Sequence, residues 1–167
     1  MPELQRLRAD HAPALLAFER ENRGYFARSV PDRGDAYFAE FAARHAALLA
    51  EQAAGDCHFH LLVDGEGAVL GRVNLVDVAD GEAELGYRIA ESAAGRGLAT
   101  GAVRRLCGVA AAEYGLTALR AATDAGNAGS RAVLVRAGFV VVGEGSSLDG
   151  GGVEVRYRRE GLGSGLV

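Results

Sequence analysis

The chain has 167 residues, the size of one compact domain, and its 49% hydrophobic and 24% charged residues are typical of a globular protein that buries a core. A formal net charge of −4 argues against a nucleic-acid-binding protein, whose surface is usually basic. It does not exclude an anionic ligand held by backbone amides. The two cysteines, Cys57 and Cys107, have no metal-ligand spacing, so we expect small buried side chains and no metal.

The amino-terminal residues 1–10 are charged and lack the apolar core of a signal peptide. No apolar run approaches the roughly 18 residues that a membrane-spanning helix needs. We therefore expect a cytoplasmic protein without a membrane partner.

The first third of the chain predicts a strand and two helices. Residues 4–8 alternate between apolar and polar, as in a strand, and Asp10 is placed to cap a helix that begins near residue 11. Glycines and a proline between residues 23 and 35 should end that helix. A second helix follows, with apolar residues at helical spacing from Tyr37 to Leu49.

The remainder of the chain predicts strands and helices that alternate. The expected elements are strands at 57–63, 68–78 and 83–90, a helix at 98–114 ended by Gly115, a strand at 119–123, a helix at 127–137 closed by Gly138, and a hairpin of 139–142 and 153–157 with a flexible loop at 143–152. His58 and His60 share one face of the first of these strands, and we expect a surface position, because two histidines are too few for a metal site. This order predicts an α+β protein with a mostly antiparallel sheet.

A run of small residues, Gly95-Arg96-Gly97-Leu98-Ala99, opens the predicted helix at 98–114. The start of a helix has backbone N–H groups without intrahelical partners and a partial positive charge, so small residues there predict a pyrophosphate site. The alternative is a plain tight turn. Two familiar phosphate motifs do not fit, because the third glycine of the dinucleotide motif is Thr100 and the Gly-Lys-Ser/Thr of the Walker A loop is absent.

A second feature is the stretch from Asn127 to Phe139, which opens with Asn127-Ala128-Gly129-Ser130. Taken alone, Asn127 has the alternative role of a helix N-cap. Together, the two stretches resemble the GCN5-related N-acetyltransferase (GNAT) superfamily, whose pyrophosphate loop falls here on Ala94 to Ala99 and whose later Asn-to-Gly-Phe segment falls on Asn127 to Phe139. The strand at Glu84–Tyr87 and the segment Phe18–Phe26 are similar to the branch of ribosomal-protein alanine and serine N-acetyltransferases.

The resemblance implies one acetyltransferase domain over residues 1–160 and a flexible tail at 161–167. It implies a mixed sheet of about seven strands flanked by four helices, with a V-shaped cofactor cleft. The activity implied is transfer of an acetyl group from acetyl-CoA, a cosubstrate, to a primary amine by direct attack. The residues implied to bind the cofactor are Ile89, Ala90, Gly95, Arg96, Gly97, Leu98, Ala99, Thr100, Asn127 and Arg136.

The same resemblance suggests the catalytic groups. Glu84 is the candidate base, acting directly or through water, and its alternative is an exposed carboxylate paired with Arg88. Ser130 is the candidate partner of the leaving thiolate, with an ordinary helix-start serine as the alternative, and a backbone N–H near Leu85 would bind the oxyanion. Tyr25 and Phe26 are candidates for the acceptor pocket.

Two departures from the family pattern keep a second hypothesis open. Ala94 replaces the usual Gln or Arg of the loop, and Leu134 stands where many members have a tyrosine general acid. A noncatalytic module that only binds coenzyme A would also fit them. The sequence leaves the acceptor open among a protein N-terminus, including that of a ribosomal protein, an aminoglycoside, a polyamine and an amino acid. The assembly is open too, with a homodimer as one alternative.

Overall fold

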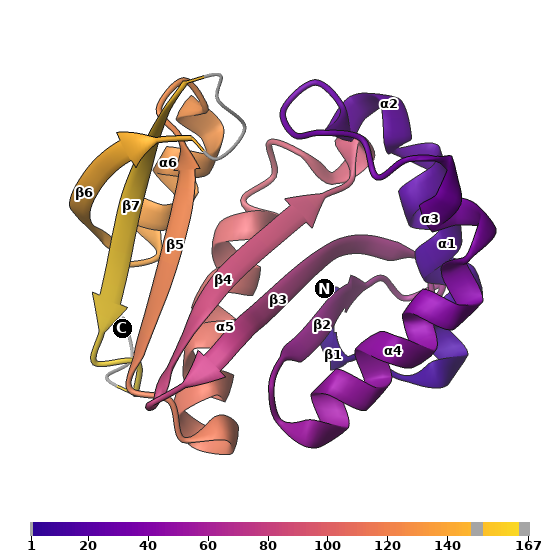
Figure 1. Cartoon of the computed structure of the whole chain (residues 1–167), viewed down its shortest axis with the longest axis horizontal. Helices are drawn as coiled ribbons and strands as arrows, with labels where there is room; N and C mark the ends of the chain where they lie inside the picture. Colours follow the sequence, from indigo (N-terminus) through magenta and orange to yellow (C-terminus); the bar gives the residue numbers. More distant parts are fainter. Residues whose placement is uncertain (1, 148–151, 164–167) are drawn as a thin grey trace.

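The computed structural model describes residues 2–147 and 152–163, and its centre is a seven-stranded sheet of order β1-β2-β3-β4-β5-β7-β6 (Figure 1). The strands are β1 (Glu3–Arg6), β2 (His58–Val63), β3 (Val69–Ala79), β4 (Glu82–Ile89), β5 (Ala118–Asp124), β6 (Val140–Ser146) and β7 (Val153–Glu160). Neighbouring strands pair antiparallel except for β4 and β5, which are parallel. The predicted α+β fold with a mixed, mostly antiparallel sheet is confirmed.

Six α-helices, rather than the four predicted, occur in the described ranges. They are α1 (Ala12–Glu21), α2 (Arg23–Phe26), α3 (Asp35–Ala39), α4 (Phe41–Ala54), α5 (Leu98–Tyr114) and α6 (Ala128–Arg136). The prediction of four is wrong because both amino-terminal helices are interrupted. Asn22 and Glu40 each have φ −103° with ψ near zero, outside the helical region, so α2 and α4 begin as new helices after them.

The predicted cap at Asp10 is also wrong. Asp10 lies inside a single 3₁₀ turn (Ala9–His11), and its carboxylate pairs with Arg8 at 3.0 Å. His11 occupies the N-cap position of α1, and its ring nitrogens contact the backbone N–H of Arg8 and the side chain of Gln5. Local polar contacts of the 3₁₀ turn therefore replace the expected side-chain cap.

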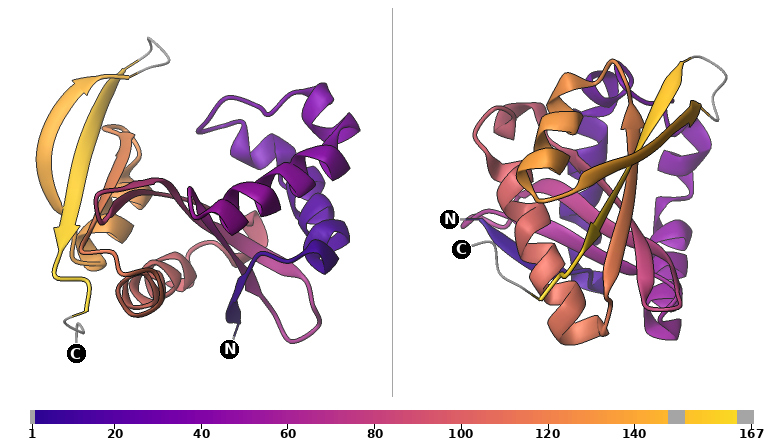
Figure 2. Two further views of the ribbon diagram at one scale, coloured as in Figure 1. Left: turned by 60° about the horizontal axis from the view of Figure 1, so that its bottom comes forward. Right: turned by 90° about the vertical axis from the view of Figure 1, so that its left-hand side faces the viewer.

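Helices cover both faces of the sheet and create two hydrophobic cores (Figure 2). Helices α1 to α4 pack on one face of the β2–β4 half, where Leu15 and Phe18 are almost fully buried. Helix α5 packs on the opposite face, where Val103 and Leu106 have no exposed surface. Each such side chain contributes about 1.5–3 kcal/mol by leaving water, so the sheet is held from both sides.

Several expectations about individual residues and segments change in the structure. His58 and His60 share a face of β2, as predicted, but they are buried and not on the surface, because α5 covers that face and Tyr114 stacks on the His58 ring at 3.7 Å. Cys107 is buried as expected, and Cys57 is half-buried. Leu162, in the predicted tail, is only 3% exposed and belongs to the α5 core, while residues 164–167 lie outside the described residues. The predicted loop at 143–152 contributes residues 143–146 to β6, and its residues 148–151 are likewise outside the described residues.

The pairing of β4 with β5 is short, and this creates the cleft. Strand β4 pairs with β5 over only three positions, where residues Glu82–Glu84 lie opposite Ala118–Arg120. Beyond those residues β4 follows β3 as far as Ile89, while β5 follows β7 as far as Asp124. The two halves of the sheet therefore diverge, and the predicted V opens between them (Figure 1). In the described part of the chain, no helix is long and apolar enough to cross a membrane.

Candidate active site

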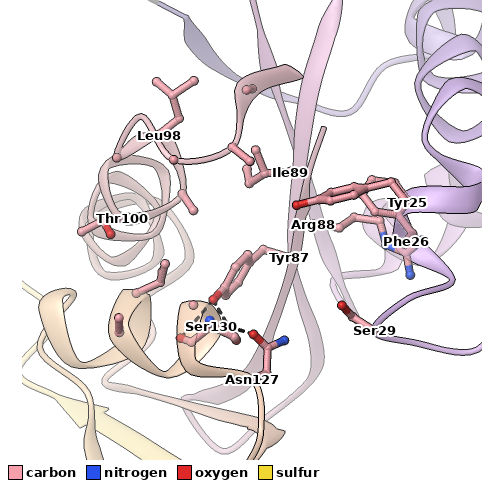
Figure 3. A pocket seen from close by; sticks show the side chains of 18 of the residues that line it. Tyr25, Phe26, Ser29, Tyr87, Arg88, Ile89, Leu98, Thr100, Asn127 and Ser130 are labelled. Atoms are coloured by element: carbon pink, nitrogen blue, oxygen red, sulfur yellow. Dashed lines mark hydrogen bonds between the residues drawn. The ribbon is translucent and has the colours of Figure 1, made fainter. Parts of the chain in front are cut away.

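A cavity of about 460 Å³ lies in the open end of the V (Figure 3). Its wall is made by the end of β4, the turn and first residues of α5, one side of α6 with its N-cap residue, and the segment that includes and follows α2. The lining residues are Tyr25, Phe26, Ser29, Val30, Tyr87, Arg88, Ile89, Ala93, Ala94, Gly95, Gly97, Leu98, Ala99, Thr100, Asn127, Gly129, Ser130, Ala132, Val133 and Arg136. Four segments that are distant in sequence therefore enclose one space.

The turn before α5 presents a run of free backbone donors. Gly95 and Gly97 have φ of +75° and +73°, a conformation that side chains rarely adopt, and no atom lies near the position of a Cβ at either residue. The six amide N–H groups of residues 95–100 have no hydrogen-bond partner among the described residues. Such a nest at the positive end of a helix dipole binds anions, so the turn fits a pyrophosphate.

The first turn of α6 forms the facing wall. Asn127 caps this helix, since its Oδ1 accepts the backbone N–H of Ser130 at 3.1 Å, and the capping role considered from the sequence is therefore real. Arg136, in the last turn of α6, also lines the cavity, and its guanidinium makes no hydrogen bond or ion pair with any described residue. A free arginine beside the amide nest adds the positive charge that a phosphate needs.

Most of the residues predicted to bind the cofactor lie in this cavity wall, namely Ile89, Gly95, Gly97, Leu98, Ala99, Thr100, Asn127 and Arg136. Two are placed elsewhere. Ala90 is 4% exposed, and its amide already donates to the Leu70 carbonyl at 2.8 Å, which leaves it nothing to offer a ligand. The Arg96 side chain is exposed outside the wall, so any contribution of Arg96 comes from its backbone amide.

The aromatic residues predicted to bind the acceptor, Tyr25 and Phe26, also lie in the wall. Phe26 is 8% exposed and packs against Phe18, and the Arg88 guanidinium lies over the Phe26 ring at 4.7 Å from its centre. Tyr25 is half-buried and presents its ring toward the cavity (Figure 3). Tyr25 is therefore the freer of the two for contact with a ligand.

Sequence reasoning missed Tyr87 as a site residue. Its side chain leaves β4 toward α6, and its hydroxyl lies 3.0 Å from Ser130 Oγ and 3.3 Å from the Ser130 carbonyl oxygen (Figure 3). Burial raises the pKa of the Tyr87 phenol above its ordinary value, with the hydrogen bond to Ser130 acting in the opposite direction. The phenol therefore keeps its proton at neutral pH. The strand pattern alone could not find this residue, because its partner lies 43 positions further along the chain.

A second cavity, of about 300 Å³, adjoins the first. Both cavities are lined by Ser29, Val30, Tyr87, Asn127 and Ser130, so they meet at the Tyr87–Ser130 contact. The second cavity also includes two carboxylates that sequence reasoning missed, Asp124 at the end of β5 and Glu154 on β7. These residues are directly opposite in the antiparallel pair, and such an arrangement of like charges destabilises a sheet unless a cation offsets it.

Glu84, the predicted base, is half-buried on β4 at the last residue that pairs with β5. Its side chain makes no hydrogen bond or ion pair with any described residue, and it is not part of the wall of either cavity. The alternative pairing of Glu84 with Arg88 is wrong, because Arg88 bonds to Glu19 at 3.2 Å. The catalytic role of Glu84 stays a prediction. Leu134, at the family's tyrosine position, is 1% exposed and belongs to the α5 core.

Comparison with known proteins identifies the family. The family model described as acetyltransferase (GNAT) domain matches residues 3–140. No curated protein sequence matches the chain. The chain belongs to the GNAT acetyltransferase family, and the predicted class, an acetyl-CoA-dependent N-acetyltransferase, is confirmed.

Solved structures share the fold at low sequence identity. The ribosomal-protein-S5-alanine acetyltransferase from Vibrio fischeri has a TM-score of 0.89 and 20% identity, with 95% of this chain and 92% of that one covered. RimL, a ribosomal L7/L12 α-N-protein acetyltransferase in complex with coenzyme A, has a TM-score of 0.86 and 18% identity, with 98% and 96% covered. RimJ from Mycobacterium smegmatis, in complex with a CoA disulfide, has a TM-score of 0.84 and 21% identity, with 95% and 81% covered. The shared fold extends over nearly the whole of this chain.

Proposed function

We propose that this enzyme acetylates the α-amine of a protein N-terminus, with the amine attacking the thioester of acetyl-CoA directly. The observation that carries the proposal is the meeting of two cavities at Tyr87 and Ser130. One cavity is lined by anion-binding groups and the other by carboxylates, so a polyphosphate cosubstrate and a cationic acceptor can enter from different sides and react where the cavities join.

The first cavity is proposed to hold coenzyme A. Its pyrophosphate would accept hydrogen bonds from the amides of residues 95–100, and Arg136 would supply a charge-assisted contact. Asn127, Leu98 and Ile89 line the remaining wall and would contact the pantetheine arm. The solved structures of RimL and RimJ, which have the same fold, contain coenzyme A or its disulfide, and this supports the assignment.

The second cavity is proposed to hold the acceptor. Asp124 and Glu154 would attract an ammonium group and would be relieved of their mutual repulsion by it. An α-amine has a pKa near 8 and an alkyl amine one near 10, so an α-amine needs less help to become neutral at pH 7. Several of the solved structures that share the fold have names that refer to ribosomal proteins as acceptors, although one is a spermidine N-acetyltransferase, and a ribosomal-protein N-terminus is the corresponding candidate here. Such an acceptor would also agree with the cytoplasmic location expected from the sequence.

The reaction needs a base, an oxyanion donor and a partner for the sulfur. We assign the base to Glu84, acting through an ordered water, because it is the half-buried carboxylate nearest in sequence to the point where β4 leaves β5. A backbone N–H near Leu85 is the candidate oxyanion donor, and Leu85 itself lines the second cavity. Ser130 is the candidate partner of the sulfur.

The test is release of coenzyme A thiol from acetyl-CoA across a panel of acceptors. Each peptide in the panel contains an internal lysine and is tested in two forms, one with a free α-amine and one formylated at its N-terminus. Spermidine and an aminoglycoside are added as non-protein acceptors. The proposal expects thiol release with free α-amines and none with the blocked peptides. Turnover limited to spermidine or the aminoglycoside would overturn the protein acceptor, and coenzyme A binding without turnover of any amine would favour the noncatalytic alternative.

A further inference from the structure

The Tyr87–Ser130 contact bridges the two sides of the cleft. Tyr87 lies on β4 and Ser130 on α6, and these elements belong to the two halves of the sheet that diverge. Their hydroxyl oxygens lie 3.0 Å apart (Figure 3). Both residues line both cavities, so the contact marks the junction of the two. The contact is therefore where a thioester in the first cavity would meet an amine from the second.

The Tyr87 hydroxyl has one proton to donate, and Ser130 offers two acceptors for it, Oγ at 3.0 Å and the backbone carbonyl oxygen at 3.3 Å. The Ser130 backbone N–H is used by Asn127 Oδ1, and its hydroxyl has one proton to donate and two lone pairs to accept with. If Tyr87 donates to Ser130 Oγ, the serine proton is free to point to a different acceptor in the cavity. If Tyr87 accepts from Ser130 Oγ, that proton is occupied. Donation to Oγ, the shorter of the two contacts, therefore leaves the serine proton free for the cavity, whereas donation to the carbonyl oxygen leaves the phenol oxygen to accept that proton.

We propose that Tyr87 is a positioning residue, whose hydroxyl donates to Ser130 Oγ and so directs the serine proton to the sulfur that leaves the acetyl group. The inference rests on coenzyme A occupying the first cavity. Residue 134, which also lines the second cavity, is a leucine and offers no hydroxyl there. A tyrosine on a different element, β4, takes over this part of the site and acts through the serine. Burial raises the pKa of the phenol, which keeps Tyr87 protonated and able to donate.

The proton balance of the reaction closes without an added reagent. The amine nitrogen forms the bond to the acetyl carbonyl carbon, and the carbon–sulfur bond breaks with its electron pair going to sulfur. An acceptor that enters as an ammonium ion loses two protons from nitrogen to water through the base, one before the attack and one after it. The sulfur gains one proton from water after release, so the reaction releases one proton overall. Ser130 and Tyr87 keep their own protons and lower the energy of the departing thiolate by hydrogen bonding, since a phenol with a raised pKa is a weaker acid than an alkyl thiol of pKa near 8.5.

The pKa of the coenzyme A thiol bound to the enzyme tests this without any acceptor. A directed hydroxyl proton stabilises the thiolate and lowers the thiol pKa, so losing it raises that pKa. Thiolate absorbance is measured during a pH titration of the enzyme with coenzyme A, and the enzyme with desulfo-coenzyme A is the blank that removes the tyrosine signal. In Tyr87→Phe, which removes one oxygen, we expect the pKa of the bound thiol to rise by about one pH unit.

The variants Ser130→Ala and Tyr87→Phe/Ser130→Ala complete a double-mutant cycle for the thiol pKa. Because Tyr87 acts through Ser130, we expect the double variant to have the same thiol pKa as Ser130→Ala, and kcat of Tyr87→Phe to fall about tenfold with KM for acetyl-CoA unchanged. The control is Tyr114→Phe, which also loses a hydrogen-bonded hydroxyl, with partners Arg6 at 2.6 Å and His60 at 2.7 Å, but lies at the far end of α5. It should affect stability only.

Two results would overturn the positioning role. One is an unchanged thiol pKa in Tyr87→Phe, and the other is a further rise when Tyr87→Phe is added to Ser130→Ala, which would mean that Tyr87 acts independently of the serine. A wild-type enzyme that does not bind coenzyme A would remove the proposed cosubstrate site, and the inference with it. The absence of a matching acceptor would leave the titration unaffected and would count against the proposed acceptor alone.

Discussion

Glu19 on α1 and Arg72 on β3 form an ion pair of 3.2 Å with side chains that are only 1% and 5% exposed. Arg33 and Arg88 bond to the same carboxylate at 2.8 Å and 3.2 Å. Arg33 belongs to the segment between α2 and α3, and Ser29 of that segment lines both cavities. One buried carboxylate thus connects the cavity wall to the two central strands.

The first prediction concerns this carboxylate. Glu19→Gln leaves Arg72 buried without a charge partner, and breaking a buried pair in this way costs about 3–5 kcal/mol of unfolding free energy. Urea denaturation measures it. Glu21→Gln, on the exposed side of the same helix, is the matched control and should change stability by less than about 0.5 kcal/mol. Equal small losses in both variants would mean that the network contributes little.

The second prediction concerns the turn before α5. In Gly97→Val a side chain occupies the space where the phosphate would approach, so we expect the affinity for coenzyme A to fall at least tenfold. Valine at φ +73° is strained as well, at a cost of about 1–3 kcal/mol in stability. Gly115→Val, at φ +65° at the other end of α5, has the same strain without facing the cavity. Calorimetry that finds equal affinities in the two variants would remove the turn from the site.

The third prediction separates the two roles of Asn127. Asn127→Ala should cost about 1 kcal/mol of unfolding free energy through loss of the cap, and should also lower coenzyme A affinity or kcat. Asn127→Ser restores a capping oxygen and should recover the stability but not the activity. If activity returns together with the melting temperature, Asn127 is a cap and nothing more.

The fourth prediction assigns different roles to two carboxylates. Glu84→Gln should lower kcat by roughly 100-fold with little change in acetyl-CoA affinity, as expected of a base. Glu154→Gln should instead raise KM for a cationic acceptor, because Glu154 lines the second cavity. Steady-state kinetics of both variants decide between these roles. If Glu84→Gln keeps the wild-type kcat and Glu154→Gln loses most of it, the base is Glu154 on β7 and not Glu84.

The fifth prediction concerns stability at acidic pH. Burial, with Arg6 as the next cause, lowers the pKa of His60 from 6.5 to about 4. As the pH falls, the unfolded chain therefore binds a proton at His60 before the folded chain does. The contribution of neutral His60 to the free energy of unfolding is complete above pH 6.5 and is lost as the pH falls from about 6.5 to about 4. The loss amounts to about 3 kcal/mol. Unfolding free energies measured at several pH values for the wild type and for His60→Gln should diverge over this window, and parallel curves would contradict the prediction.

Local features of the sequence were sufficient for most element boundaries. The helix at 98–114 is found as predicted, with Gly115 at φ +65° ending it, and the Gly138 turn has φ +90°. These signals are local because a positive φ and a missing Cβ are properties of one residue. The exceptions are the helix interruptions at Asn22 and Glu40. Neither residue is a glycine or a proline, so the sequence contains no helix-breaking signal at these two positions.

The sequence by itself determined the family and the glycine-rich turn, because these depend on residues that are neighbours in the chain. The tertiary structure decided which side chains share the cleft. Tyr87 meets Ser130 because β4 and β5 separate after only three residue pairs and α6 follows β5, while Asp124 meets Glu154 through the pairing of β5 with β7. Contacts of this kind depend on strand register and order, and a pattern of hydrophobic residues along one strand contains no information about which strand lies beside it.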